Sequence, residues 1–186
     1  MEAVTMYELF VLGELSIQAK HGYELQFMLK SSVGPIRQIS SGTLYPLISR
    51  LVKSGYISQR DELQEGGRPR KIYELTENGR QRFIDLMAAP LEYNTDIELM
   101  FHFKMNFFLY SPVNVQSATL KQYLEYLQYN LSYITDMESQ VAVKQEIPER
   151  KRTQVLRMFS HRKAISKAEI VWVTEEIERV KHDTNI

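Results

Sequence analysis

Two neighbouring stretches in the first half of the chain restrict its fold more than any other part of the sequence. The first, residues 40–51, starts with a serine that can cap a helix and then places apolar residues on one side, namely Leu44, Leu47, Ile48 and Leu51. The second, residues 55–76, reads as two strands joined by a glycine-rich tip at Gly66-Gly67. A helix followed by a basic-tipped β-hairpin is typical of a winged helix-turn-helix domain, so the chain is expected to bind DNA.

The groups on these two stretches suit nucleic acid. The polar side of the helix carries small or flat hydrogen-bonding side chains, which can reach phosphates and base edges from the major groove. The hairpin carries positive groups, which suit phosphate or minor-groove contacts. The candidate DNA-binding residues are Ser40, Ser41, Thr43, Tyr45, Arg50, Arg68, Arg70 and Lys71. A half-buried Tyr45 and solvated hairpin charges are the plainer alternatives.

Charge and composition set limits on this interpretation. The 23 basic residues balance 23 acidic ones, but residues 37–82 hold nine Lys or Arg against five Asp or Glu, a modest footprint for DNA. The absence of cysteine excludes disulfides, thiolate zinc sites and cysteine nucleophiles. No apolar run reaches the roughly 18 residues of a membrane span, and Glu2 does not suit a secretion signal. We therefore expect a cytoplasmic protein without a membrane partner.

The remaining pattern predicts a mainly α-helical chain with two domains. Helices are expected over residues 3–16, from 21 or 22 to 32, and from a cap at Thr76 to residue 87; Gly55 should stop the helix that starts at Ser40. Pro90 closes this module, so residues 1–90 are assigned to a winged helix-turn-helix domain. Residues 91–186 are assigned to a helical dimerisation domain.

That second domain begins with Thr95-Asp96-Ile97-Glu98, which has capping-box spacing, and an almost wholly apolar helix over residues 99–110. Apolar residues then alternate at spacings of four and three from Leu120 to Val141, interrupted by Glu138, which is the pattern of a coiled-coil seam. A second such seam runs from Leu156 to Val180 and is interrupted by Lys163 and Ser166. Pro148 separates the two helices. More apolar surface than one helical hairpin can bury favours a homodimer that reads a near-palindromic DNA operator. Four tyrosines are expected on an exposed or partner-facing side, namely Tyr123, Tyr126, Tyr129 and Tyr133.

Several motifs in the same order resemble the PadR family of bacterial transcriptional regulators. They are Gly42-Thr43-Leu44-Tyr45-Pro46 with Arg50-Leu51, and Gly67-Arg68-Pro69-Arg70-Lys71 followed by Tyr73, Leu75-Thr76 and Gly79-Arg80, with support from His21-Gly22-Tyr23-Glu24. Asp96, Glu98, Lys104 and the Trp172…Glu175-Glu176 ending resemble the family's longer-tailed branch, which includes the phenolic-acid-responsive repressor and a virulence activator. The resemblance implies dimerisation through the C-terminal helices.

The same resemblance implies a small aromatic, phenolic acid as an effector that binds between the domains and releases the DNA. The candidate ligand-binding residues are Tyr23, His102, Lys104, Arg157 and Trp172. Each has a structural alternative: His102 as a core histidine, Trp172 as dimer packing, and the others as core or seam residues. A different effector, such as a drug, or none at all, is the alternative for the family.

Catalysis has little support in the sequence, because it contains no glycine-rich phosphate loop, no histidine pair at metal spacing and no nucleophile elbow. We therefore expect no enzyme, no metal site and no cofactor. The strongest rival is a winged-helix module whose hairpin and third helix contact a protein. Affinity that falls steeply with salt would separate DNA binding from that alternative.

Overall fold

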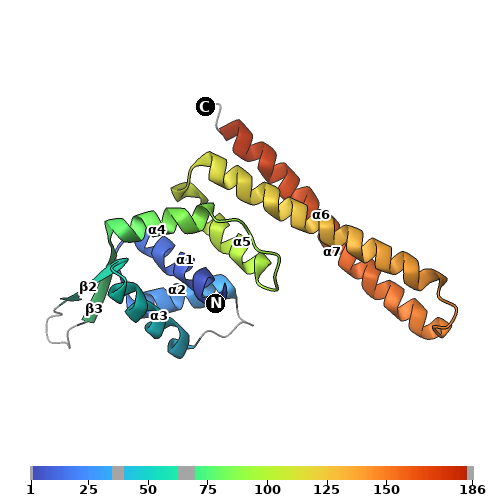
Figure 1. The fold of residues 1–186 in the computed structure, drawn as a ribbon, viewed down its shortest axis with the longest axis horizontal. Helices are drawn as coiled ribbons and strands as arrows, with labels where there is room; N and C mark the ends of the chain where they lie inside the picture. Colours follow the sequence, from blue (N-terminus) through green and yellow to red (C-terminus); the bar gives the residue numbers. More distant parts are fainter. Residues whose placement is uncertain (1, 35–39, 63–69, 184–186) are drawn as a thin grey trace. The chain divides into compact units, whose positions relative to one another are not determined.

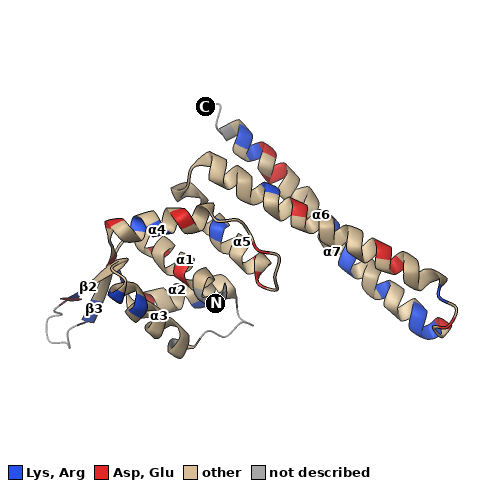
Figure 2. Ribbon diagram, in the orientation of Figure 1, with Lys and Arg blue, Asp and Glu red and all other residues tan. Residues whose placement is uncertain are grey.

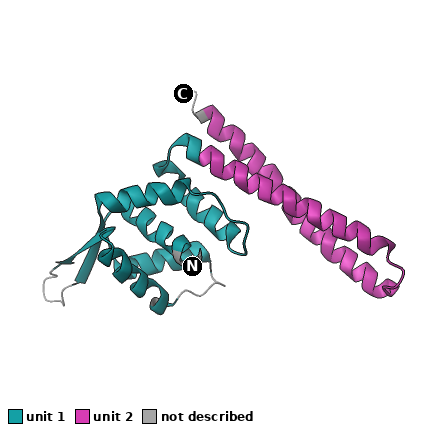
Figure 3. Ribbon diagram, viewed as in Figure 1, with its two compact units in different colours: residues 1–115 teal, residues 116–186 magenta. Residues whose placement is uncertain are grey.

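A computed structural model describes residues 2–34, 40–62 and 70–183, and these divide into two compact units, residues 1–115 and 116–186 (Figure 3). The predicted mainly α-helical fold with a winged helix-turn-helix is confirmed. The apolar helix after Pro90 lies in the first compact unit and contacts its first helix, although the sequence grouped it with the C-terminal part. The functional division at residue 90 stays a prediction.

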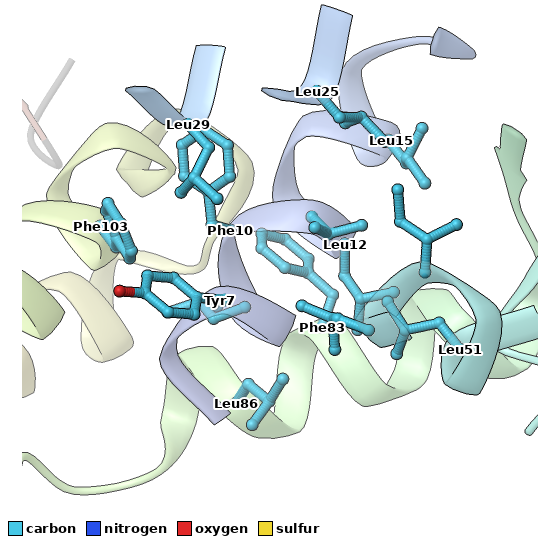
Figure 4. Packing of buried hydrophobic residues seen from close by; sticks show 14 of the residues in the cluster. Tyr7, Phe10, Leu12, Leu15, Leu25, Leu29, Leu51, Phe83, Leu86 and Phe103 are labelled. Atoms are coloured by element: carbon cyan, nitrogen blue, oxygen red, sulfur yellow. The ribbon is translucent and has the colours of Figure 1, made fainter. Parts of the chain in front are cut away.

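The first unit is built around α1 (Glu2–Ile17). Leu9, Phe10, Val11 and Leu12 are four consecutive buried residues, so α1 has no purely solvent-facing side along this stretch. It is contacted by four helices and one strand, namely α2 (Gly22–Val33), α3 (Ser41–Lys53), α4 (Glu77–Ala88), α5 (Ile97–Asn106) and β3 (Arg70–Leu75). Figure 4 shows Phe10 and Leu12 among side chains of the surrounding helices, including Leu25, Leu51 and Phe83.

The helix-turn-helix consists of α2 (Gly22–Val33) and α3 (Ser41–Lys53), and the wing of β2 (Ile57–Glu62) and β3 (Arg70–Leu75) (Figure 1). The two wing strands are antiparallel, with Gln59 opposite Tyr73. A further strand, β1 (Lys20–His21), pairs with β3, so the sheet order is β1-β3-β2. Two residues carry no periodic pattern, and for this reason β1 was not predicted.

The predicted helix stop and cap are both confirmed and lie against each other. After α3, Gly55 has φ +71°, its amide donates to Val52 O at 3.0 Å, and the Tyr56 amide donates to Leu51 O at 3.0 Å, which is a Schellman motif. The hydroxyl of Thr76 accepts the Gly79 amide at 3.0 Å and so caps α4 (Glu77–Ala88). The same hydroxyl lies 2.7 Å from Gly55 O. The end of α3 is therefore fixed to the start of α4.

The helix after Pro90 differs from the expectation at both ends. Helix α5 runs over Ile97–Asn106 and is followed by a 3-10 turn, η1 (Phe108–Tyr110), so the expected continuous helix over residues 99–110 is wrong. The expected capping box is also wrong, because the residue before α5 is Asp96 and its side chain makes no capping hydrogen bond. Phe107, which directly follows α5, reaches Gly13 of α1: a Cβ on Gly13 would lie 2.5 Å from its ring. This close approach explains the glycine inside α1.

The second unit contains the helical hairpin of α6 (Val113–Val143) and α7 (Glu149–Asp183). Both predicted seams are confirmed in part: Leu120, Leu127 and Ile134 are buried on α6, and Phe159, Val173, Ile177 and Val180 on α7. The breaks in the two seams pair with each other, since the ammonium of Lys163 contacts the carboxylate of Glu138.

The expectation for the four tyrosines of α6 is wrong at one of them. Tyr123 is buried, and its hydroxyl donates to Glu169 Oε1 at 3.2 Å. Tyr126 stacks on it with ring centroids 5.9 Å apart. Tyr129 and Tyr133 are exposed, as expected. The tyrosines sit at spacings of three and four, so the sequence pattern alone did not distinguish the buried one.

Candidate nucleic-acid interface

Helix α3 separates its buried and exposed residues as the sequence predicts. Leu44, Leu47, Ile48 and Leu51 have at most 3% of their surface exposed and pack into the core. The exposed side carries Thr43, Tyr45, Ser49 and Arg50. The helix begins at Ser41, but the preceding Ser40 hydroxyl makes no capping bond and lies 3.3 Å from the Thr43 hydroxyl. Both hydroxyls are exposed at the start of α3.

An open depression of about 280 Å³ brings the end of β1, the start of α2, α3 and the wing together. It is lined by His21, Gly22, Tyr23, Tyr45, Arg70, Lys71 and Tyr73. Gly22 leaves room for the Tyr45 ring, because a Cβ there would lie 2.9 Å from its Cε1 atom. Burial, and to a smaller extent the neighbouring Tyr45, raises the pKa of Tyr73. Three of the predicted DNA-binding residues, Tyr45, Arg70 and Lys71, thus share one surface.

The positive charges of this surface are available to a ligand. Arg50 and Lys53 on α3 and Arg70 and Lys71 on β3 are exposed, and Figure 2 shows Lys and Arg on both elements. Within the described residues, none of these four has a carboxylate within 4.0 Å. The Arg70 guanidinium lies 5.5 Å from the centroid of the Tyr23 ring, a cation–π arrangement that fixes the charge without neutralising it. Arg68 and the Gly66-Gly67 tip lie outside the described residues.

His21 holds the wing in place, a role that sequence reasoning missed. Its Nδ1 lies 3.0 Å from Lys71 O on β3, and its Nε2 lies 3.1 Å from Glu62 Oε2 on β2. Both partners are hydrogen-bond acceptors, and either ring nitrogen can donate to its partner when it carries a proton. Its own amide donates to Glu24 Oε2 at 2.7 Å. Its partners are 41 and 50 residues away, and no local signal in the sequence reveals them.

The predicted effector residues are found in different surroundings. Tyr23 lines the depression beside the wing. Lys104 is buried and lines a separate cavity of about 200 Å³ between α1, α4 and α5. His102 is exposed, so the alternative of a core histidine is wrong. Arg157 and Trp172 are on α7 of the second unit, where Arg157 is exposed and Trp172 has 40% of its surface exposed.

Lys104 has an unusual environment for a lysine. It has 1% of its surface exposed, and its ammonium donates to Met87 O at 3.0 Å and to Ala89 O. These carbonyls stand at the C-terminal end of α4, where a helix favours positive charge. Burial lowers the pKa of Lys104 from 10.5 to about 8. Among the described residues, no carboxylate lies within 4.0 Å of it.

The described residues contain no group of three or more His, Asp or Glu side chains arranged to hold a metal ion. None of their helices combines the length and the apolar character that crossing a bilayer requires.

Residues 11–85 match the model of the transcriptional regulator PadR-like family. A solved structure, smu.1704 of Streptococcus mutans UA159, is 31% identical over 45% of this chain and 74% of its own, with a TM-score of 0.40. The chain belongs to the PadR-like family. The matched residues contain α2, α3, the wing strands and most of α4, and they include every residue that lines the depression.

Other PadR-like structures are similar to the chain over different lengths. A PadR-like transcription factor of Bacteroides fragilis is 28% identical over 47% of this chain and 82% of its own, with a TM-score of 0.43. Bacillus subtilis PadR, solved in complex with operator DNA, is 19% identical over 93% of this chain and 98% of its own, with a TM-score of 0.43. No curated protein matches the sequence.

Proposed function

We propose that the protein is a dimeric, sequence-specific DNA-binding transcriptional regulator. The observation that carries this proposal is the surface formed by α3 and the wing. There, exposed hydroxyls stand beside four exposed cations that have no carboxylate within 4.0 Å in the described part of the chain. Helix α3 would enter the major groove with Ser41 and Thr43 near the bases. Tyr45 would contact a phosphate, as would the cations Arg50, Arg68, Arg70 and Lys71. Membership of a family of transcriptional regulators and the operator-bound relative support it.

The dimer is supported by an apolar stripe on α7. Met158, Ile165 and Trp172 are spaced by seven residues and have 48%, 50% and 40% of their surface exposed. Seven-residue spacing keeps side chains along one side of a helix, as in coiled coils. We propose that a second copy covers this stripe, so that residues 91–186 dimerise and residues 1–90 bind a near-palindromic operator, with half-sites about 34–36 Å apart.

The finer part of the proposal is a cytoplasmic repressor that a small aromatic acid releases from DNA. It is supported by resemblance to the phenolic-acid-responsive branch and by Lys104, a buried cation on the wall of a cavity. A member of the same family with a different effector, or with none, is the alternative. A winged-helix module that binds protein is the rival from another class. The four cations that no described carboxylate pairs with favour DNA over it.

One set of measurements tests these steps in order. Genomic fragments retained by the protein are sequenced to find an operator, and its affinity is then measured by fluorescence anisotropy at several salt concentrations. Light scattering should give twice 21.8 kDa, and the logarithm of affinity should fall steeply with that of salt. Hydroxycinnamic acids at millimolar concentration should lower operator affinity and change Trp172 fluorescence. A monomer that binds DNA tightly would overturn the proposed dimer. An operator affinity that does not depend on salt would overturn the proposed phosphate contacts.

A further inference from the structure

His21 contacts both strands of the wing at the end that lies farther from the core. Its Nδ1 lies 3.0 Å from Lys71 O on β3, and its Nε2 lies 3.1 Å from Glu62 Oε2 on β2. Glu62 pairs with Arg70 at the outer end of the ladder, whereas Ile57 at the inner end is buried in the core. His21 therefore supports the outer end of the wing from the start of α2.

The two contacts cannot both be hydrogen bonds when the ring of His21 is neutral. A neutral imidazole carries one N–H and one unprotonated nitrogen, whereas an imidazolium carries two N–H groups. The carbonyl of Lys71 and the carboxylate of Glu62 are both acceptors. In the neutral ring, one nitrogen lone pair therefore faces an oxygen lone pair, and that contact opens. The doubly protonated ring holds both strands, while the neutral ring holds one.

The elements packed against His21, or lining the depression beside it, carry charged and titratable side chains of both signs. They are Tyr23 and Glu24 of α2, Tyr45 of α3, Arg60, Asp61 and Glu62 of β2, and Arg70, Lys71, Tyr73 and Glu74 of β3. Arg60 and Glu74 pair with each other at 2.8 Å. Hydrogen bonding at the two ring nitrogens and the charge of Glu62 favour the imidazolium, whereas Arg70 and Lys71 oppose it.

We propose that His21 is a positioning residue for DNA binding, which holds the wing in its binding position when its ring carries two protons. Arg70 and Lys71 lie on the strand that His21 fixes, so their placement against phosphates depends on this contact. Operator affinity then rises as the pH falls through the range in which a histidine becomes charged, about pH 8 to 5. The side chain of His21 is 12% exposed and both nitrogens face the wing, so the ring acts through the wing. This proposal rests on the proposed DNA binding.

Three variants of the full-length protein separate the hydrogen bonds of His21 from its charge. Glu62→Gln offers an amide N–H to Nε2, so the neutral ring keeps both contacts and operator affinity should be equal at pH 6 and pH 8. His21→Asn keeps a donor for Lys71 O but does not reach Glu62, so affinity should be low at both pH values. Asp61→Asn removes a negative charge from the neighbouring, exposed residue of β2 as the matched control, and it should keep the pH dependence of the wild type.

Two measurements at pH 6 and pH 8 test the proposal. In fluorescence anisotropy, the wild type and Asp61→Asn should bind the operator about 2- to 5-fold more weakly per wing at pH 8, the contribution of a partly exposed ion pair. In the free protein, hydrogen exchange of the β2 and β3 amides reports opening of the wing. After correction for the intrinsic effect of pH, exchange should be faster at pH 8 in the wild type and equal at both pH values in Glu62→Gln.

Weaker binding and faster corrected exchange of the wild type at pH 8, both absent in Glu62→Gln, would support the proposal. The same pH dependence of affinity in the wild type and Glu62→Gln would overturn it, because a charged ring acting directly on DNA predicts that result. The proposed DNA binding would then still stand. Absence of DNA binding at both pH values would refute the proposed function and with it the role of His21 in DNA binding, whereas pH-dependent exchange would still show that His21 fixes the wing.

Discussion

Replacing Lys104 with methionine should change the pH dependence of stability in a way that tests its buried charge. Methionine keeps a side chain of similar length but cannot be charged. In the folded protein, burial lowers the pKa of Lys104 from 10.5 to about 8, because the charged form loses its hydration. Between these two pH values the unfolded chain binds more protons than the folded protein. The free energy of unfolding of the wild type therefore rises with pH across this window.

The magnitude follows from the two pKa values. Each pKa unit corresponds to 1.36 kcal/mol, so the charged Lys104 costs the folded wild type about 3 kcal/mol at pH 7. By the same relation the cost is about 2 kcal/mol at pH 9 and below about 0.5 kcal/mol at pH 10.5. The methionine variant carries no such cost at any pH. The variant also lacks the hydrogen bonds that Lys104 donates to Met87 O and Ala89 O. This loss is the same at every pH, so it shifts the difference in unfolding free energy between the two proteins but not the pH dependence of that difference.

The assay is urea unfolding of both proteins at one protein concentration and at pH 7, 9 and 10.5. Relative to the variant, the wild type should gain about 3 kcal/mol between pH 7 and pH 10.5. Tyrosines and exposed lysines titrate in both proteins and cancel in the difference. The control Lys121→Met removes an exposed lysine and should differ from wild type by a constant amount. A difference between wild type and Lys104→Met that stays constant within about 0.5 kcal/mol would show that Lys104 is not held charged in a buried site.

Four further substitutions test the DNA surface and the helical hairpin. Lys71→Ala should weaken binding to all DNA sequences and reduce the salt slope by about one, measured by anisotropy against salt; an unchanged slope would remove Lys71 from the phosphate contacts. Gly22→Ala should displace the exposed Tyr45 ring and weaken operator binding with little change in thermal stability; unchanged affinity would show that Tyr45 does not contact DNA. Glu138→Leu and Lys163→Leu should each destabilise the protein in urea, and the double variant should recover stability, with a coupling of about 0.5–3 kcal/mol. Strict additivity would show that the ion pair contributes nothing.

The parts of the fold that the sequence predicted correctly depend on contacts between near neighbours in the chain. The apolar side of α3 is set by spacings of three and four, and the stop at Gly55 by a left-handed φ that glycine adopts without strain. The Thr76 cap needs the amide of Gly79, three residues away. In each case the sequence pattern and the structure involve the same few residues, so local reasoning was sufficient.

The parts that were missed depend on residues far apart in the sequence. Gly13 lowers the helix propensity of α1 without an evident reason until the ring of Phe107 is placed against it. The strand β1 and the role of His21 exist because β3 passes beside them, 50 residues later. At α5, two adjacent polar residues, Thr95 and Asp96, both suited a cap, and the helix starts after the second. Of the site, the surface of α3 and the wing was predicted, whereas the surroundings of Lys104 were not.

Lys104 differs from the other charged residues that lie among apolar side chains in what its charge contacts. Lys163 interrupts one seam, Glu138 interrupts the other, and the two pair with each other. Lys20 is buried, and its ammonium lies 3.5 Å from the buried carboxylate of Glu14, whose pKa is raised by burial although Lys20 opposes this. Each of these charges has a counter-ion within the protein, as burial requires. Lys104 is equally buried, but no carboxylate of the described residues lies within 4.0 Å of its ammonium, which donates instead to the carbonyls of Met87 and Ala89 at the end of α4.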